Sequence, residues 1–231
     1  MIKITYHFKF PETNEPTLTF KFGLDDKTVS FIQLEEVKET HEEWTNLNFE
    51  KCQNCPLNES QVKQCPIAKN LNHLTFFFKD TKSFKKSMIF VETEERAYAK
   101  NASIQEGLFS IFGVIMATSD CPHMNFLKPM ARFHLPFSTP EETMFRAYST
   151  FLLKEYLNEN YSRDVLNQLF ALYKETQMVN DGILARIRKI AKGDANQNAV
   201  IILNNFTQIM EVDRSTDLSM VKEMFKNIRL K

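Results

Sequence analysis

The residues best suited to chemistry in this chain are its four cysteines, Cys52, Cys55, Cys65 and Cys121. Cys52 and Cys55 are separated by two residues, a spacing that can place two sulfur atoms on one metal ion or cluster. Three of the four cysteines are followed directly by proline, which restricts the backbone and stiffens a ligand loop. We therefore expect all four cysteines to act as the ligands of one metal centre.

The spacing of the cysteines favours an iron–sulfur cluster, such as [4Fe–4S], over zinc. A zinc ribbon usually supplies two short-spaced pairs, whereas this chain has one pair and two single cysteines. Zinc stays open as the alternative cofactor. A metal-free alternative also stays open, in which the cysteines form two disulfides or are small buried residues without mutual contact.

The elements that position these cysteines begin with a small antiparallel sheet. Apolar and polar residues alternate from Ile2 to Phe10, from Leu18 to Phe22 and again near Phe31, which is the period of half-buried strands. A further strand or two between about residues 86 and 100 is expected to join this sheet. An acidic helix or loop is expected from residue 35 onward.

Cys121 is expected to be delivered to the other cysteines by a central helix. Ser103 and Glu106 form a capping-box pattern, and the helix that follows, residues 104–118, is apolar on nearly every side. A helix of this kind is buried. Because it ends just before Cys121, it would carry this residue from the core to the cysteine loop.

The remaining pattern is helical. We expect helices at residues 66–79, 140–158 (with a capping box at Thr139 to Glu142), 165–192, after Asp194, and from Ser215 or Thr216 with Ile228 facing inward. The fold class is therefore α+β, a small N-terminal antiparallel sheet packed on a mainly helical bundle. We divide the chain into a strand-rich part, residues 1–100 with the cysteine loop 52–66, and a helical bundle, residues 101–231, in one continuous globular unit.

Composition excludes several function classes. Lys and Arg number 29 and are balanced by 29 Asp and Glu, so no nucleic-acid partner is expected. The 5 glycines are too dispersed for a phosphate-binding loop, and the nucleophile-elbow and zinc-protease motifs are absent. The most apolar stretch, residues 108–117, is too short to cross a membrane. With no export signal at the start, we expect a soluble cytoplasmic protein without a membrane partner.

Arg132, His134 and Glu142 form a second candidate site. An acid–base histidine near a carboxylate and arginines resembles a catalytic collection. The structural alternative is stronger, because Glu142 suits a helix N-terminus and is four residues from Arg146, the spacing of a helical ion pair. A basic cluster at Arg186, Arg188, Lys189 and Lys192 is expected to be a solvated helix end that complements the helix dipole.

Four sequence blocks resemble the signature of an uncharacterised bacterial protein family. The blocks are Cys52-Gln-Asn-Cys55-Pro-Leu57, Cys65-Pro-Ile-Ala68, Met116-Ala-Thr-Ser-Asp-Cys121-Pro-His123 and Lys128-Pro-Met-Ala-Arg-Phe-His-Leu-Pro-Phe137. The resemblance also includes Val179-Asn180 and residues 194–199, so it covers most of the chain. Asp120 stands where the family pattern has glycine. The resemblance implies that the cysteines and the Arg132–Phe137 loop belong to one region, and it implies no activity.

The expected function is a cytoplasmic metal-centre protein used for redox chemistry or sensing. The alternatives are a structural zinc protein, an enzyme that uses Arg132, His134 and Glu142 beside the centre, and a metal-free interaction module.

Overall fold

The alternating segments form a five-stranded antiparallel sheet with the order β3-β2-β1-β4-β5 in the described part of the chain. The computed structural model describes residues 1–13, 15–34, 42–162, 164–226 and 228, so the expected acidic segment at residues 35–41 lies outside it. The strands are β1 (Ile2–Phe10), β2 (Glu15–Leu24), β3 (Phe31–Gln33), β4 (Lys86–Glu92) and β5 (Ala97–Ser103). β1 is central, and its Tyr6 lies opposite Phe20 of β2 and Val91 of β4.

The helices follow the boundaries that local signals predict. They are α1 (Pro66–Phe78), α2 (Ile104–Thr118), α3 (Lys128–Arg132), α4 (Pro140–Leu157), α5 (Val165–Ile190), α6 (Ala195–Ser215) and α7 (Ser219–Phe225), with short 3-10 turns η1 (Glu43–Thr45) and η2 (Pro122–Leu127). Pro66 occupies the first turn of α1, and both predicted capping boxes, at Ser103 and Thr139, are formed. The predicted α+β class is confirmed.

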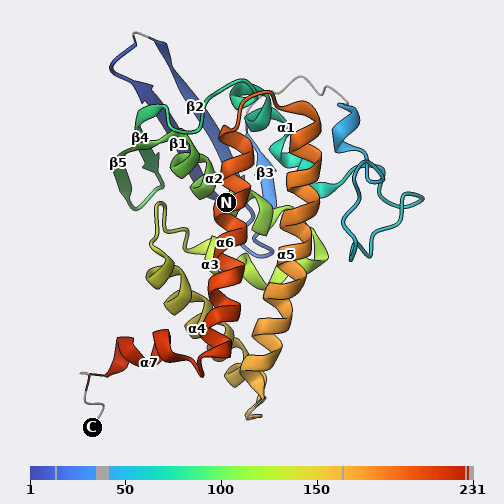
Figure 1. Ribbon diagram of the computed structural model, residues 1–231, viewed down its shortest axis with the longest axis vertical. Coiled ribbons are helices and arrows are strands. Elements are labelled where there is room, and N and C mark those ends of the chain that lie inside the picture. The colour runs from blue at the N-terminus through green and yellow to red at the C-terminus, as the bar shows by residue number, and fades with distance from the viewer. Residues whose placement is uncertain (14, 35–41, 163, 227, 229–231) are drawn as a thin grey trace.

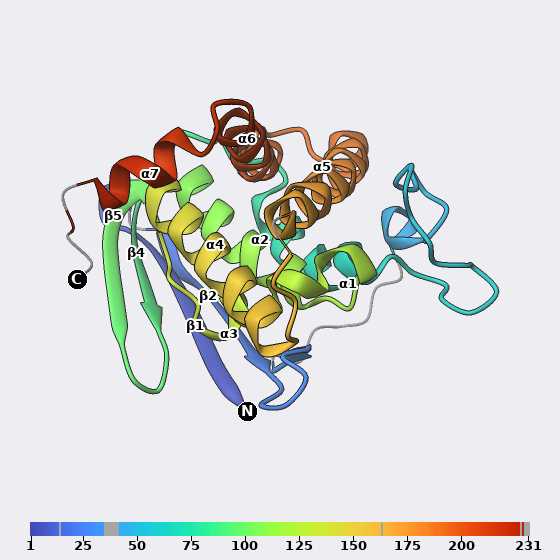
Figure 2. The same ribbon diagram turned by 90° about the horizontal axis from the view of Figure 1, so that it is seen from below.

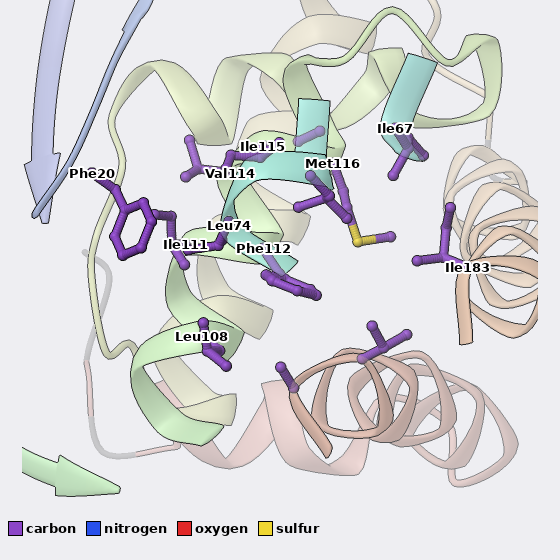
Figure 3. Packing of buried hydrophobic residues seen from close by; sticks show 14 of the residues in the cluster. Phe20, Ile67, Leu74, Leu108, Ile111, Phe112, Val114, Ile115, Met116 and Ile183 are labelled. Carbon is purple, nitrogen blue, oxygen red and sulfur yellow. The ribbon is translucent and has the colours of Figure 1, made fainter. Parts of the chain in front are cut away.

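Helix α2 lies between the sheet and the two long helices α5 and α6 (Figures 1 and 2). Its Gly107 lies against the sheet so closely that an added Cβ would be 2.4 Å from the Ile89 side chain. Figure 3 shows its apolar side chains between Phe20 of β2, Leu74 of α1 and Ile183 of α5. The sequence prediction of a helix buried in the centre is therefore confirmed, since most of its residues are buried.

Helix α5 belongs to two hydrophobic clusters. Its first half contributes Leu169 and Tyr173 to a cluster with α4 and α6, and its second half contributes Val179 and Ile183 to the main core with the sheet and α2. One straight element therefore connects the two halves of the bundle.

The C-terminal end differs from the prediction. α6 continues to Ser215, and α7 starts at Ser219 rather than at Ser215 or Thr216. Asp217 and Leu218 between them adopt positive φ angles, and the Leu218 amide donates to the Asp213 carbonyl. The inward position expected for Ile228 is wrong, because this residue follows α7 and is 56% exposed.

Candidate metal centre

The first cysteine pair lies on a loop that is closed at its base by backbone hydrogen bonds. The Leu47 amide donates to the Lys63 carbonyl at 2.9 Å, and the Cys65 amide donates to the Thr45 carbonyl at 2.8 Å. Within the loop, the Cys55 amide donates to the Cys52 carbonyl at 3.0 Å and forms the turn that the Cys-x2-Cys spacing predicts. The loop, which is light blue to cyan in Figure 1, lies beside α5.

A buried arginine of α5 holds this loop base in place. Arg186 is 1% exposed, and its two terminal nitrogens donate to the carbonyls of Trp44, Asn46 and Leu47 at 2.7, 2.7 and 2.8 Å. The expectation of a solvated basic helix end is therefore wrong for Arg186, although Arg188 and Lys189 are exposed. The arginine satisfies three carbonyls at once and brings a positive charge to the cysteines.

Gly182 allows α5 to approach the loop closely. A Cβ added there would be 2.4 Å from the Cys52 sulfur and 3.1 Å from its Cα. The Cys52 thiol donates to the Val179 carbonyl at 3.9 Å. A side chain at position 182 would therefore displace Cys52, which explains a glycine within a helix, where it costs about 1 kcal/mol relative to alanine.

Cys65 and Cys121 each come directly before a helical turn. Cys65 is the N-cap of α1 and Cys121 is the N-cap of η2, each has an extended backbone, and each is followed by proline at the first helical position. Both side chains are 8% exposed. Because it is the N-cap, Cys65 lies at the positive end of the α1 helix dipole.

The four cysteines gather at one place, which we call the cysteine corner. Burial raises the pKa of the Cys121 thiol to about 12; the backbone N–H of His123 lowers it, while the charges of Cys65, Cys52 and Cys55 raise it further. Burial likewise raises the pKa of Cys52 to about 11, Cys65 and Cys55 add to the rise, and the Arg186 charge opposes it. All four are free thiols. The effects of Cys55 and Cys65 on both Cys52 and Cys121 indicate that the fold brings the three cysteine-bearing segments near one another.

The geometry of the corner is not that of a ready-made site for one ion. In the described ranges, no three His, Cys, Asp or Glu side chains form a group that could hold a metal ion. The four free thiols fit a thiolate-bound metal by donor chemistry, and the assignment of all four as ligands stays a prediction.

A second layer of polar contacts orients the Cys52–Cys55 turn. His123, two residues after Cys121, donates from Nε2 to the Asn54 carbonyl at 2.8 Å. The Asn54 side-chain amide donates to the Glu175 carboxylate of α5 at 2.6 Å. The sequence analysis did not select these residues or Gly182 and Arg186; an isolated glycine in a helical pattern was the one available signal.

Asp120 adopts a backbone conformation that glycine favours. Its φ is 58°, in the left-handed region that glycine enters without cost. Partial burial opposes ionisation of Asp120, but hydrogen bonds from Lys128 and Ser30, together with the Lys128 charge, outweigh it and lower its pKa. The carboxylate receives both hydrogen bonds at 2.8 Å and so connects the turn before Cys121 to the loop before β3.

The second candidate group is not held together by direct contacts. Arg132 donates to the Asp26 carbonyl at 2.5 Å, His134 Nε2 is 2.5 Å from the Tyr6 hydroxyl, and Glu142 accepts from the Thr139 amide at 2.8 Å. Among the described residues, no hydrogen bond or ion pair joins any two of Arg132, His134 and Glu142. Their expected catalytic role therefore stays untested, and each has a structural partner of its own.

The fold and the corner define an α+β protein in which a tertiary contact gathers four free cysteines beside a buried arginine. The chain belongs to the family described as "Domain of unknown function (DUF6901)", whose sequence model matches residues 4–226. This confirms the expected resemblance to a family without an assigned activity over most of the chain. No curated protein and no solved structure matches the chain. None of the helices in the described ranges has the length and apolar character to cross a membrane.

Proposed function

We propose that this protein is a cytoplasmic metal-centre protein in which Cys52, Cys55, Cys65 and Cys121 hold an iron–sulfur cluster used for redox chemistry or sensing. The observation that carries the proposal is the corner itself. The four cysteines of the chain come from three separate segments, and Cys55 and Cys65 raise the pKa of both Cys52 and Cys121. Four unrelated cysteines would not be expected to converge in this way.

The surroundings of the corner suit a negatively charged centre. Four thiolates around a metal carry net negative charge, and the buried Arg186 cation lowers the pKa of Cys52 against its burial. The His123 amide donates to the Cys121 sulfur, and the N-terminus of α1 lies behind Cys65. Hydrogen bonds to the sulfurs and nearby charge are the means by which a protein sets the potential of a cluster.

The spacing of the cysteines supports a cluster rather than zinc, because the chain has one short-spaced pair and two single cysteines instead of the two pairs of a zinc ribbon. A bound cluster would supply one-electron transfer or sensitivity to oxidants. The residues of the chain would bind it, exclude water by burial of Cys65 and Cys121, and stabilise its charge through Arg186.

The test is the visible absorption, iron, sulfide and zinc content of protein purified without oxygen. We expect a broad visible absorption with iron and sulfide. If the protein is colourless and holds one zinc ion, the site is a structural zinc site and not a cluster. If it holds neither metal, the proposal is wrong.

Single Cys→Ser changes then test the ligand set. Each of the four changes should remove the metal to a similar extent, because all four sulfurs belong to one centre. His134→Ala is the control and should keep the metal, since its ring nitrogen bonds to Tyr6 and not to a cysteine. Full metal content in Cys121→Ser would show that the four-ligand assignment is wrong.

A further inference from the structure

A pocket of about 130 Å³ lies between α2, α4, α5, α6 and the segment around α3. Much of its wall is apolar, with Val114, Met124, Leu127, Leu203 and Phe206 among the lining residues. An engineered apolar cavity of about 150 Å³ in another protein binds benzene, so this pocket has room for a body of about one aromatic ring. Its size therefore selects small ligands.

One ionised side chain, Arg146, lines the pocket, and the described lining residues include no Asp or Glu. Arg146 Nη2 donates to the carbonyls of Met130 and Phe133 at 2.6 and 2.9 Å, which fixes the direction of the guanidinium. The other guanidinium nitrogens make no hydrogen bond to a described residue, and no described carboxylate forms an ion pair with Arg146. Burial lowers the pKa of Arg146, whereas the Glu142 charge raises it without a direct ion pair. A half-buried cation with no carboxylate in direct contact favours an anion beside it.

Two further polar side chains of the pocket also have no partner. Tyr173 is 4% exposed, and Asn180, about two turns further along α5, is 2% exposed. Both line the pocket, and neither side chain hydrogen bonds to another residue in the described part of the chain. Neither polar group is among the fully buried side-chain atoms that lack a hydrogen-bond partner, so both are accessible to a small ligand. A hydroxyl and an amide without a protein partner, in the wall of a pocket that also holds a cation, supply the few polar contacts that orient a ligand.

His134 does not add a second charge. Burial, together with the charge of Arg146, lowers the pKa of His134 to about 3, and its Nε2 already bonds to the Tyr6 hydroxyl. The imidazole is therefore neutral at pH 7. The pocket thus combines an apolar body site of one ring with a single positive charge, which matches a monoanion better than a phosphate dianion.

We propose that this pocket binds a small carboxylate with an apolar body of about one ring, whose carboxylate lies on Arg146 and accepts hydrogen bonds from Tyr173 and Asn180. A planar carboxylate matches the fork of an arginine, and the apolar walls replace water around the body. The site is separate from the cysteine corner and does not depend on the proposed metal centre.

The first test uses the wild-type protein and needs no variant. Benzoate is titrated by calorimetry and by amide NMR shifts, and benzamide, which has the same shape but no charge, is titrated in parallel. We expect saturable benzoate binding and at least about tenfold weaker benzamide binding, the usual size of a lost charge-assisted hydrogen bond. Equal affinity for the two, or no saturable binding of benzoate, would overturn the proposal.

Three variants locate the site. Gly113 lines the pocket, and a Cβ added there would be 3.5 Å from Leu203, an ordinary van der Waals contact. Gly113→Leu should therefore fold, fill the pocket with its side chain and abolish benzoate binding. Arg146→Gln should weaken benzoate at least about tenfold and leave benzamide unchanged. Tyr173→Phe removes a hydroxyl without a described partner and should weaken benzoate several-fold, which tests the site even if Arg146→Gln fails to fold.

The control is Arg188→Gln, which removes an exposed cation of α5. It should leave benzoate binding unchanged. Benzoate binding that survives Gly113→Leu would place the ligand elsewhere and overturn the assignment.

Discussion

The two candidate regions of this protein, the cysteine corner and the pocket lined by Arg146, contact different faces of α5 and are built in opposite ways. Val179, Gly182 and Arg186 face the cysteine corner, whereas Tyr173 and Asn180 face the carboxylate pocket. With 3.6 residues per turn, these two sets are about a third of a turn apart around the helix. The corner is formed by backbone brought into contact, and the pocket by side chains that leave space between them.

Two glycines in helices illustrate this difference between the corner and the pocket. At Gly182 an added Cβ would be 2.4 Å from the Cys52 sulfur, and at Gly113 of α2 it would be 3.5 Å from Leu203. The same residue type therefore permits close approach in one region and leaves a pocket wall open in the other. The role of a glycine in a helix is therefore identified by asking which atoms an added methyl group would contact.

The largest effect is expected at Arg186. Arg186→Met leaves three carbonyls without their donor and should lower the free energy of unfolding by at least about 3 kcal/mol, measured by urea denaturation. Arg188→Met, two residues further along the same helix and exposed, is the matched control and should change stability by less than about 0.5 kcal/mol. Similar losses for the two variants would mean that the carbonyl contacts do not hold the corner.

The glycine pair gives effects of opposite sign. Gly182→Ala should destabilise the protein by about 1–3 kcal/mol and reduce its metal content, because the methyl displaces Cys52. Gly113→Ala should instead stabilise it by up to about 1 kcal/mol, because the methyl has room and alanine favours the helix. Thermal unfolding and metal analysis of both variants check this; a stabilised Gly182→Ala protein with full metal would remove the distinction between the two faces.

The smallest effect is expected at Asp120, at the edge of the corner. Asp120→Ala should cost about 1 kcal/mol, since alanine enters the left-handed region less readily, whereas Asp120→Gly should cost only a few tenths. The folded-state pKa of Asp120 is lowered, so its contribution is present above the unfolded value of about 3.9 and disappears as the pH falls through the folded value. Urea denaturation of both variants at pH 7 and pH 3 tests the ranking and its pH dependence; an Asp120→Gly protein less stable than Asp120→Ala would contradict it.

Local signals predicted most of the fold. Pro66, the Ser103–Glu106 box and the Thr139–Glu142 box start helices where they were expected, because each capping interaction involves residues within one turn. The start of α7 was missed because it depends on a contact specific to this fold, the buried Asp213 that accepts from Tyr148 and from the Met220 amide.

The sequence predicted the cysteines of the candidate site but not the residues of α5 that pack against them. The apolar pattern of α2 indicated that Cys121 would reach the other cysteines, and the structure gathers all four. The partners on α5 could not be predicted, because Arg186 has the same sequence setting as a solvated cation at a helix end. Its three carbonyl acceptors lie more than 130 residues earlier, and only tertiary structure brings them together.

The parts of the cysteine corner are made at different times during protein synthesis. Leu47 is made 139 residues before Arg186, the side chain that holds its carbonyl. At translation rates of about 5–20 residues per second, roughly 7–28 s pass between the two events. From their own synthesis until Arg186 is made, the first three cysteines have neither the cation nor the helix face that later covers them. A newly made chain thus exposes these thiols to metals and oxidants before α5 can cover them.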